Sequence, residues 1–196
     1  SRITSPGRGQ TVLEDIKKNA AQRMTKSIAA LKDEFRKLRT GRAHTALLEH
    51  VTVEYYGSQV PISQTATVAV EDARTLTVAP WEKQMAAAVE KAILTSDLGL
   101  TPVSAGAVIR VPLPPMTEER RKELVKVVRH ETEGGRVAVR NIRRDALGDV
   151  KDLLKEKLVT EDEDHQAHDE IQKLTDGAVA QMDQLLKDKE TEIMEF

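Results

Sequence analysis

The stretch Arg136-Val-Ala-Val-Arg140-Asn-Ile-Arg143-Arg144 carries four arginines and no acidic residue. It lies in a run from about residue 117 to residue 158 whose apolar spacing predicts one long helix. At about 100° per residue, one side of that helix collects small and apolar residues and the other collects basic ones. The first set is Leu124, Val128, Gly135, Ala138, Ile142, Ala146 and Leu153, and the second is Lys122, Lys126, Arg129, Arg136, Arg140, Arg143, Arg144, Lys151 and Lys155. We therefore expect one face to pack in a core and the other, the basic stripe, to bind a polyanion.

Two further long helices are predicted on either side of this one. From about Val12 to Arg39, apolar residues recur three and four positions apart, which is typical of a helix packed on other helices. Thr117 is expected to cap the central helix, and Thr160 with Glu163 forms a capping box for the last one. Residues 15–41 and 116–196 are thus predicted to form an elongated antiparallel three-helix bundle.

The middle of the chain has a different pattern. Alternation over residues 51–55 and β-rich runs over 65–70, 75–79 and 108–111 predict strands, and residues 83–96 predict a short helix. Ala86, Val89, Ile93 and Leu94 are expected on the inner side of this helix, and Trp81 in the core. Tyr55 and Tyr56 are expected to lie partly in the core and partly at the surface. The fold class is therefore α+β, with a small β/α/β domain over residues 42–115 inserted between the first two bundle helices.

Two breaks in the pattern mark the connections between the predicted domains. One spans residues 39–42, with Thr40 and Gly41, and the other spans residues 111–115, with Pro112, Pro114 and Pro115. Because the chain crosses twice, we expect a hinge or swivel rather than free tumbling.

The first residues are rich in Gly, Pro, Ser and Arg, and residues 1–14 are expected to form a disordered lead. A tag, a native extension and a transit-peptide remnant all remain open as its origin. The chain has no cysteine, which excludes disulfides and thiolate metal sites. It has no apolar run near the ~20 residues that a membrane span needs. His165 and His168 stand beside acidic residues at a helix start and are not expected to bind metal. Without a phosphate loop or a catalytic motif, we expect no cofactor and no enzymatic activity.

Charge is distributed unevenly along a chain whose net charge is only −2. Residues 110–157 carry 13 basic and 9 acidic side chains, whereas residues 158–196 carry 3 basic and 12 acidic ones. Aromatic residues are absent from the basic stripe, so RNA contact there would be to phosphates and shape rather than by base stacking. A solvated helix face is the alternative. A general RNA-binding bundle and a coiled-coil adaptor that uses the acidic last helix also remain open.

From Asp15 to Phe196 the sequence resembles the ribosome recycling factor family. The resemblance rests on these strings, in this order: residues 38–43 (LRTGRA), 53–57 (VEYYG), 96–100 (SDLGL), 109–115 (IRVPLPP), 117–124 (TEERRKEL), 136–146 (RVAVRNIRRDA) and 172–176 (QKLTD). It implies an L-shaped molecule that binds the ribosome after peptide release. With elongation factor G and GTP, such a factor splits the ribosome into subunits.

The resemblance also implies which residues contact large-subunit rRNA. These are Arg140, Arg143 and Arg144, with Arg129 and Arg136 extending the line and Arg39 and Arg42 near the hinge. It implies a monomer in the bacterial cytoplasm, with an organelle stroma or matrix as the alternative, and no membrane partner. Gly134-Gly135 departs from the family pattern, and a weak point or slight bend is expected there, because glycine costs about 1 kcal/mol against alanine inside a helix.

Overall fold

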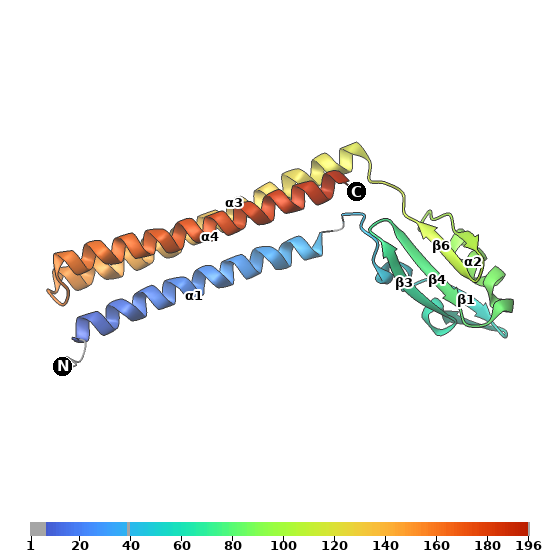
Figure 1. The fold of residues 1–196 in the computed structure, drawn as a ribbon, viewed down its shortest axis with the longest axis horizontal. Coiled ribbons are helices and arrows are strands. Elements are labelled where there is room, and N and C mark those ends of the chain that lie inside the picture. Colours follow the sequence, from blue (N-terminus) through green and yellow to red (C-terminus); the bar gives the residue numbers. More distant parts are fainter. Residues whose placement is uncertain (1–6, 39, 196) are drawn as a thin grey trace. The chain divides into compact units, whose positions relative to one another are not determined.

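The computed structural model describes residues 7–38 and 40–195, which form two compact units. The first unit comprises the chain up to Leu38 together with Lys122–Met194, and the second comprises the segment between them through Arg121. The first unit is helical and the second contains the strands (Figure 1). The predicted α+β fold class, with a strand-containing unit inserted after the first bundle helix, is confirmed.

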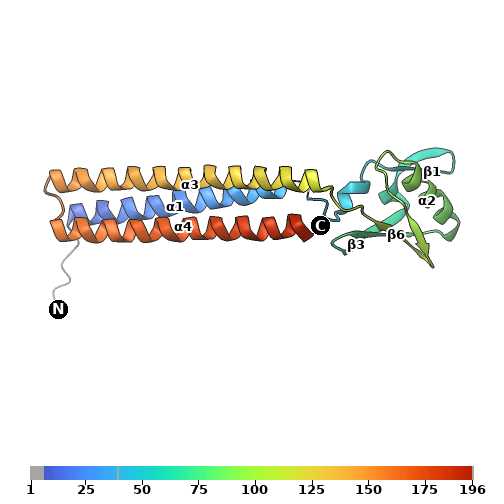
Figure 2. The same ribbon diagram turned by 90° about the horizontal axis from the view of Figure 1, so that it is seen from above.

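The helical unit contains three long helices that lie side by side (Figure 2). They are α1 (Arg8–Lys37), α3 (Glu118–Lys155) and α4 (Glu161–Glu195), with α3 and α4 antiparallel and joined by a short turn. The backbone N–H of Arg120 donates to Thr117 Oγ1 at 3.2 Å, so the predicted cap of α3 is confirmed. The capping box at the start of α4 is confirmed too: Glu163 N–H donates to Thr160 Oγ1, and Thr160 N–H donates to the Glu163 carboxylate, both at 3.1 Å.

Each of the three helices buries one row of side chains in a shared core. The most deeply buried apolar members are Ala20 and Met24 in α1, Leu124, Val128, Val139 and Val150 in α3, and Ala167, Ile171, Met182 and Ile193 in α4. Two threonines are buried among them. The hydroxyls of Thr132 and Thr175 donate to the carbonyl oxygens four residues earlier, at 2.7 and 2.8 Å, so neither polar group is left unsatisfied.

The helix α1 begins at Arg8, so the predicted disordered lead over residues 1–14 is wrong for residues 8–14. Gly9 and Leu13 are both buried in the bundle. A Cβ atom on Gly9 would lie 1.9 Å from the carbonyl oxygen of Leu158 in the turn between α3 and α4, so only glycine permits this approach. Local composition suggested disorder, and a contact with a residue far along the chain overrides it. Residues 1–6 lie outside the described part of the chain.

The helix α3 runs without interruption through Gly134-Gly135. A Cβ atom on Gly135 would lie 3.0 Å from Met182 Sδ and 3.8 Å from Leu31 Cδ2, so the missing side chain lets α4 and α1 pack close to α3. Gly134 is exposed, and a Cβ atom there would meet nothing within 4 Å. The two glycines therefore differ: packing accounts for the second, and nothing in the structure explains the first.

The other unit contains two antiparallel sheets and one helix. One sheet pairs β1 (Thr52–Tyr55) with β2 (Ser58–Pro61). The other has the strand order β3 (Ala66–Asp72), β4 (Thr75–Pro80), β6 (Val108–Pro112) and β5 (Val103–Ala105). The helix is α2 (Ala86–Thr95), and short 3₁₀ turns cover Thr45–Leu48, Ile62–Gln64 and Lys83–Met85. The core of this unit is formed by Leu48, Val53, Leu76, Val78, Val89, Ile93 and Val111, among others. The sequence did not indicate β2 and β5, which are short and mostly exposed.

Two residues that were predicted to be buried in this unit are exposed. Leu94 is 56% exposed because Val89 and Ile93, four residues apart, already form the inner side of α2. Trp81 is 63% exposed, and its indole N–H donates to Thr67 Oγ1 at 2.9 Å. The expectation for the two tyrosines is confirmed, since Tyr55 is half-buried and Tyr56 is exposed.

Candidate nucleic-acid interface

The basic stripe lies along α3, opposite the side of this helix that is buried in the bundle. Leu124, Val128, Val139, Ile142 and Ala146 are buried, and most of the basic side chains point away from them. The packing of the apolar face therefore fixes which way the basic face points. The neighbouring acidic side chains decide how much of its charge is left for a ligand.

Two of the predicted phosphate-binding arginines form ion pairs with α4. Arg129 Nε donates to Glu190 Oε1 at 2.7 Å. Arg136 donates to Asp183 Oδ1 through Nε at 2.9 Å and through Nη2 at 2.5 Å. Its side chain is only 22% exposed, and these hydrogen bonds raise the pKa of the Arg136 guanidinium further above its ordinary value. Arg136 therefore stabilises the contact between α3 and α4.

Glu133 occupies the middle of the basic stripe. Its carboxylate accepts hydrogen bonds from Arg136 Nη1 at 2.9 Å and from Arg140 Nη1 at 3.4 Å. The bond from Arg136, followed by that from Arg140, lowers the pKa of Glu133, so this carboxylate is charged at neutral pH. Arg136 is thus paired with two carboxylates, and Arg140 with one at longer range.

Arg143 and Arg144 are in a different environment. Arg143 is half-buried and its Nη1 donates to the neutral Gln172 Oε1 at 3.4 Å. Arg144 is exposed and forms no ion pair with any residue in the described ranges. The same is true of Lys126 and Lys151 on the same helix. Planar guanidinium groups that are not already paired with carboxylates are well suited to bind phosphate through two oxygens at once.

Both connections between the two units are attached to the same turn, between β3 and β4. The N–H of Ala43 donates to the carbonyl oxygen of Ala73, and the N–H of Leu113 donates to that of Arg74, both at 2.7 Å. Pro112 belongs to β6, opposite Thr75. The first two residues of the predicted hinge at 111–115 belong to the sheet, and Pro114 and Pro115 follow the attached segment. Motion at these residues stays a prediction.

The first connection contains two of the predicted hinge residues. Gly41 has a φ of +79°, a conformation that favours glycine, and its Cβ would lie 3.0 Å from Met116 Cγ. Thr40 is buried, and Arg42, a predicted rRNA contact, is exposed. Arg39, the other predicted contact near the hinge, lies outside the described residues.

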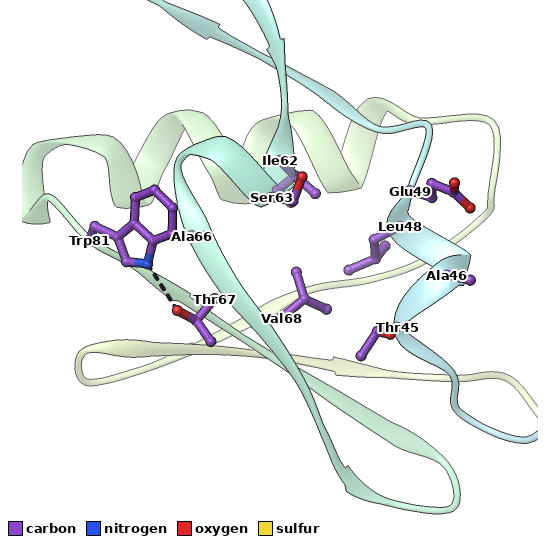
Figure 3. A pocket seen from close by; sticks show the side chains of 10 residues that line it. All are labelled: Thr45, Ala46, Leu48, Glu49, Ile62, Ser63, Ala66, Thr67, Val68 and Trp81. Carbon is purple, nitrogen blue, oxygen red and sulfur yellow. Dashed lines mark hydrogen bonds between the residues drawn. The ribbon is translucent and has the colours of Figure 1, made fainter.

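A groove of about 600 Å³ lies in the strand-containing unit, between Trp81 and the turn over Thr45–Leu48 (Figure 3). It is lined mainly by apolar and hydroxyl side chains, with Glu49 as its acidic residue. Among the described residues, no group of three or more His, Asp or Glu side chains is arranged to hold a metal ion. His165 and His168 each lie near a different aspartate, at 3.8 and 3.7 Å. Within residues 7–38 and 40–195, no helix has both the length and the apolar character to cross a membrane.

The sequence did not identify the role of α4 at this surface. The sequence indicated only that the last helix is acidic, yet Asp183 and Glu190 on this helix pair with the basic stripe. A signal was present, because Arg129 and Arg136 are seven residues apart, and so are Asp183 and Glu190.

Comparisons with known proteins agree with this architecture. The family model for ribosome recycling factor matches residues 31–194. The ribosome-recycling factor of Thioalkalivibrio sulfidiphilus is 63% identical, over 93% of this chain and 98% of the relative. That of Halorhodospira halophila is 60% identical, over 94% of this chain and all of the relative.

Two solved structures are similar to the chain as well. A solution structure of ribosome recycling factor is 44% identical, covers 94% of this chain and 98% of its own, and superposes with a TM-score of 0.59. The other is a model of the T. thermophilus ribosome recycling factor, bound with E. coli elongation factor G to the E. coli post-termination complex. It is 50% identical, covers 92% of this chain and 98% of its own, and has a TM-score of 0.54. The chain therefore belongs to the ribosome recycling factor family and has that family's role in ribosome recycling.

Proposed function

We propose that this protein binds the post-termination ribosome and, together with elongation factor G and GTP, splits it into subunits. Large-subunit rRNA would be contacted through the basic stripe of α3. A related factor is described in a complex with elongation factor G and the post-termination ribosome, which supports the choice of partners. The GTPase activity would belong to elongation factor G.

The observation that carries the rRNA contact is the state of Arg143 and Arg144. These adjacent arginines form no ion pair with a carboxylate of the described residues, whereas Arg129 and Arg136 each do. Binding phosphate through Arg136 would require breaking its hydrogen bonds to two acids, which opposes the gain. We therefore place the rRNA contact at Arg143 and Arg144, with Arg140 beside them, and assign Arg129 and Arg136 to the α3–α4 contact. Contacts by Arg39 and Arg42 stay predictions.

The proposed mechanism has an anchor and a moving part. The basic stripe anchors the bundle on rRNA, and the strand-containing unit moves about the two connections when elongation factor G acts on it. The attachment of both connections at the β3–β4 turn supports a hinge near Gly41 and near Pro114-Pro115. The relatives named above come from bacteria, which favours the bacterial cytoplasm over an organelle as the location. The protein would act as a monomer.

Co-sedimentation with intact ribosomes and with protein-free rRNA tests the proposal, combined with a subunit-splitting assay with and without elongation factor G and GTP. We expect binding to intact ribosomes and a steep fall in affinity as the salt concentration rises. We expect splitting only when elongation factor G and GTP are both present. Arg144→Ala should weaken binding, while Lys187→Ala, which removes one positive charge from α4, serves as the control. Equal binding to protein-free rRNA would favour a general RNA-binding bundle instead. Unchanged affinity at high salt would contradict phosphate contact.

A further inference from the structure

The facing helices α3 and α4 repeat their contacts every seven residues. Arg129 bonds Glu190, and seven residues further along α3, Arg136 bonds Asp183. Because the helices are antiparallel, each step forward on α3 matches a step back on α4. In both pairs a carboxylate lies directly against a guanidinium, so it offsets part of the positive charge of the arginine.

The third step of this repeat breaks the pattern. Seven residues after Arg136 on α3 is Arg143, and seven residues before Asp183 on α4 is Asp176, again an acid. However, Arg143 Nη1 donates to Gln172 Oε1 at 3.4 Å, and Gln172 Nε2 donates to Asp176 Oδ1 at 2.8 Å. The side-chain amide of Gln172 therefore lies between the guanidinium and the carboxylate.

The chemistry of the amide fixes its orientation. A carboxylate can only accept hydrogen bonds and a guanidinium can only donate them, so the amide NH₂ must face Asp176 and its oxygen must face Arg143. An amide oxygen holds a guanidinium without cancelling its charge. A carboxylate in the same place would hold the guanidinium, which stays protonated, and would offset its charge, as Asp183 does at Arg136.

We infer that Gln172, oriented by Asp176, is a positioning residue that holds the Arg143 guanidinium for RNA phosphate without a carboxylate to offset its charge. This inference rests on the proposed function. A side chain that is already held loses less conformational freedom on binding, which favours affinity. The side chain that α4 places against each arginine of α3 would thus determine the role of that arginine. An arginine that faces an acid stabilises the bundle, and Arg143, which faces Gln172, remains available to a ligand.

The substitution Gln172→Glu tests this directly, because it changes only an amide into a carboxylate. The chain contains a matched control in Gln184, which lies on the same helix and is exposed. Its Nε2 also donates to an aspartate four residues later, Asp188, at 2.8 Å. No arginine of the described residues donates to Gln184 Oε1. Gln184→Glu therefore introduces the same charge next to the same kind of neighbour, without facing an arginine.

The measurement is the dissociation constant of the full-length protein for intact ribosomes over a range of salt concentrations. Wild type is compared with Gln172→Glu, Gln184→Glu, Arg143→Ala and the double variant Gln172→Glu/Arg143→Ala. We expect Gln172→Glu to weaken binding about tenfold, the order of one charge-assisted hydrogen bond. We also expect it to make the slope of log K against log salt shallower by about one. Gln184→Glu should stay near wild type, and the double variant should be no weaker than Arg143→Ala alone. Because Gln172 is exposed, circular dichroism should show the same helical content in all five proteins.

The possible failures are distinguishable. If Arg143→Ala itself binds like wild type, the proposed rRNA contact at this residue is overturned. If Arg143→Ala weakens binding but Gln172→Glu behaves like Gln184→Glu, only the positioning role is overturned. If Gln172→Glu weakens binding equally in the Arg143→Ala background, Gln172 acts independently of Arg143, and the inference is also overturned. Gln172→Met, which keeps the length of the side chain but cannot accept the hydrogen bond, should lie between wild type and Gln172→Glu.

Discussion

The glycine pair in α3 allows the same substitution to be made at two adjacent positions with different expected effects on stability. Gly134→Ala places a methyl group where nothing lies within 4 Å. Alanine is favoured over glycine inside a helix by about 1 kcal/mol, so this variant should be more stable by about that amount. For a chain of this size, the midpoint of thermal unfolding should rise by about 2–4 °C.

Gly135→Ala gains the same helix propensity, but its added methyl group crowds the core. Its Cβ would lie 3.0 Å from Met182 Sδ and 3.2 Å from Met182 Cε, whereas carbon atoms make favourable contacts at about 3.5–4.0 Å. Met182 is fully buried, so it must shift against other core atoms, and overpacking of this kind costs about 1–3 kcal/mol. The net change should be between about zero and a loss of 2 kcal/mol, since the gain of about 1 kcal/mol offsets part of the cost.

Urea unfolding followed by far-ultraviolet circular dichroism would measure both variants, with equal dependence on urea as the check that the unfolding transition is unchanged. In a Met182→Ala background the crowding atoms are gone, so Gly135→Ala should there be as favourable as Gly134→Ala. If the two alanines stabilise the wild-type protein equally, Met182 moves aside without cost, and the packing explanation of Gly135 is wrong. A destabilising Gly134→Ala would contradict the view that its Cβ points into open space.

Three further predictions concern the ends of helices. Thr160→Ala removes the cap of α4 and should lower the free energy of unfolding by about 1 kcal/mol, measured by urea unfolding. The backbone hydrogen bond from Thr160 lowers the pKa of Glu163, so the stability that the Glu163 carboxylate contributes is present at neutral pH and is lost as the pH falls through the lowered pKa. The difference in unfolding free energy between wild type and Glu163→Gln should therefore shrink in acid. A difference that stays constant with pH would contradict this. Gly9→Ala would collide with the carbonyl oxygen of Leu158 and should increase hydrogen exchange over the first turns of α1, whereas Gly7→Ala, with nothing within 4 Å, should leave exchange unchanged.

Membership in the family also decides whether the protein is an enzyme. The match to ribosome recycling factor over residues 31–194, together with the closely similar relatives, confirms a non-enzymatic translation factor. The strings that suggested this family are distributed over most of the chain, so the fold could be predicted from the sequence. Which rRNA atoms are contacted cannot be read from the sequence, because that depends on the environment of each arginine.

Several features followed from local sequence because their causes are local. The seam of α1 and the caps at Thr117 and Thr160 depend on residues within one or two helical turns of each other. The strands β3 and β4 were predicted from runs of β-favouring residues, and β4 buries Leu76 and Val78, two residues apart. In such elements, the backbone hydrogen bonds and the apolar period are set by neighbours in the chain.

Other features were decided only by tertiary structure. The beginning of α1 at Arg8 depends on Leu158, about 150 residues away, and Trp81 is exposed although its residue type suggested burial. The sequence placed the charge of the basic stripe on one face of α3, but not which arginines keep that charge available. Residues on α4, between 29 and 61 positions later in the chain, decide this: a carboxylate offsets the charge of Arg136, whereas the amide of Gln172 leaves the charge of Arg143 unopposed. The physical reason is that electrostatic pairing acts over a few ångströms in space, and only the packing of the helices brings those groups together.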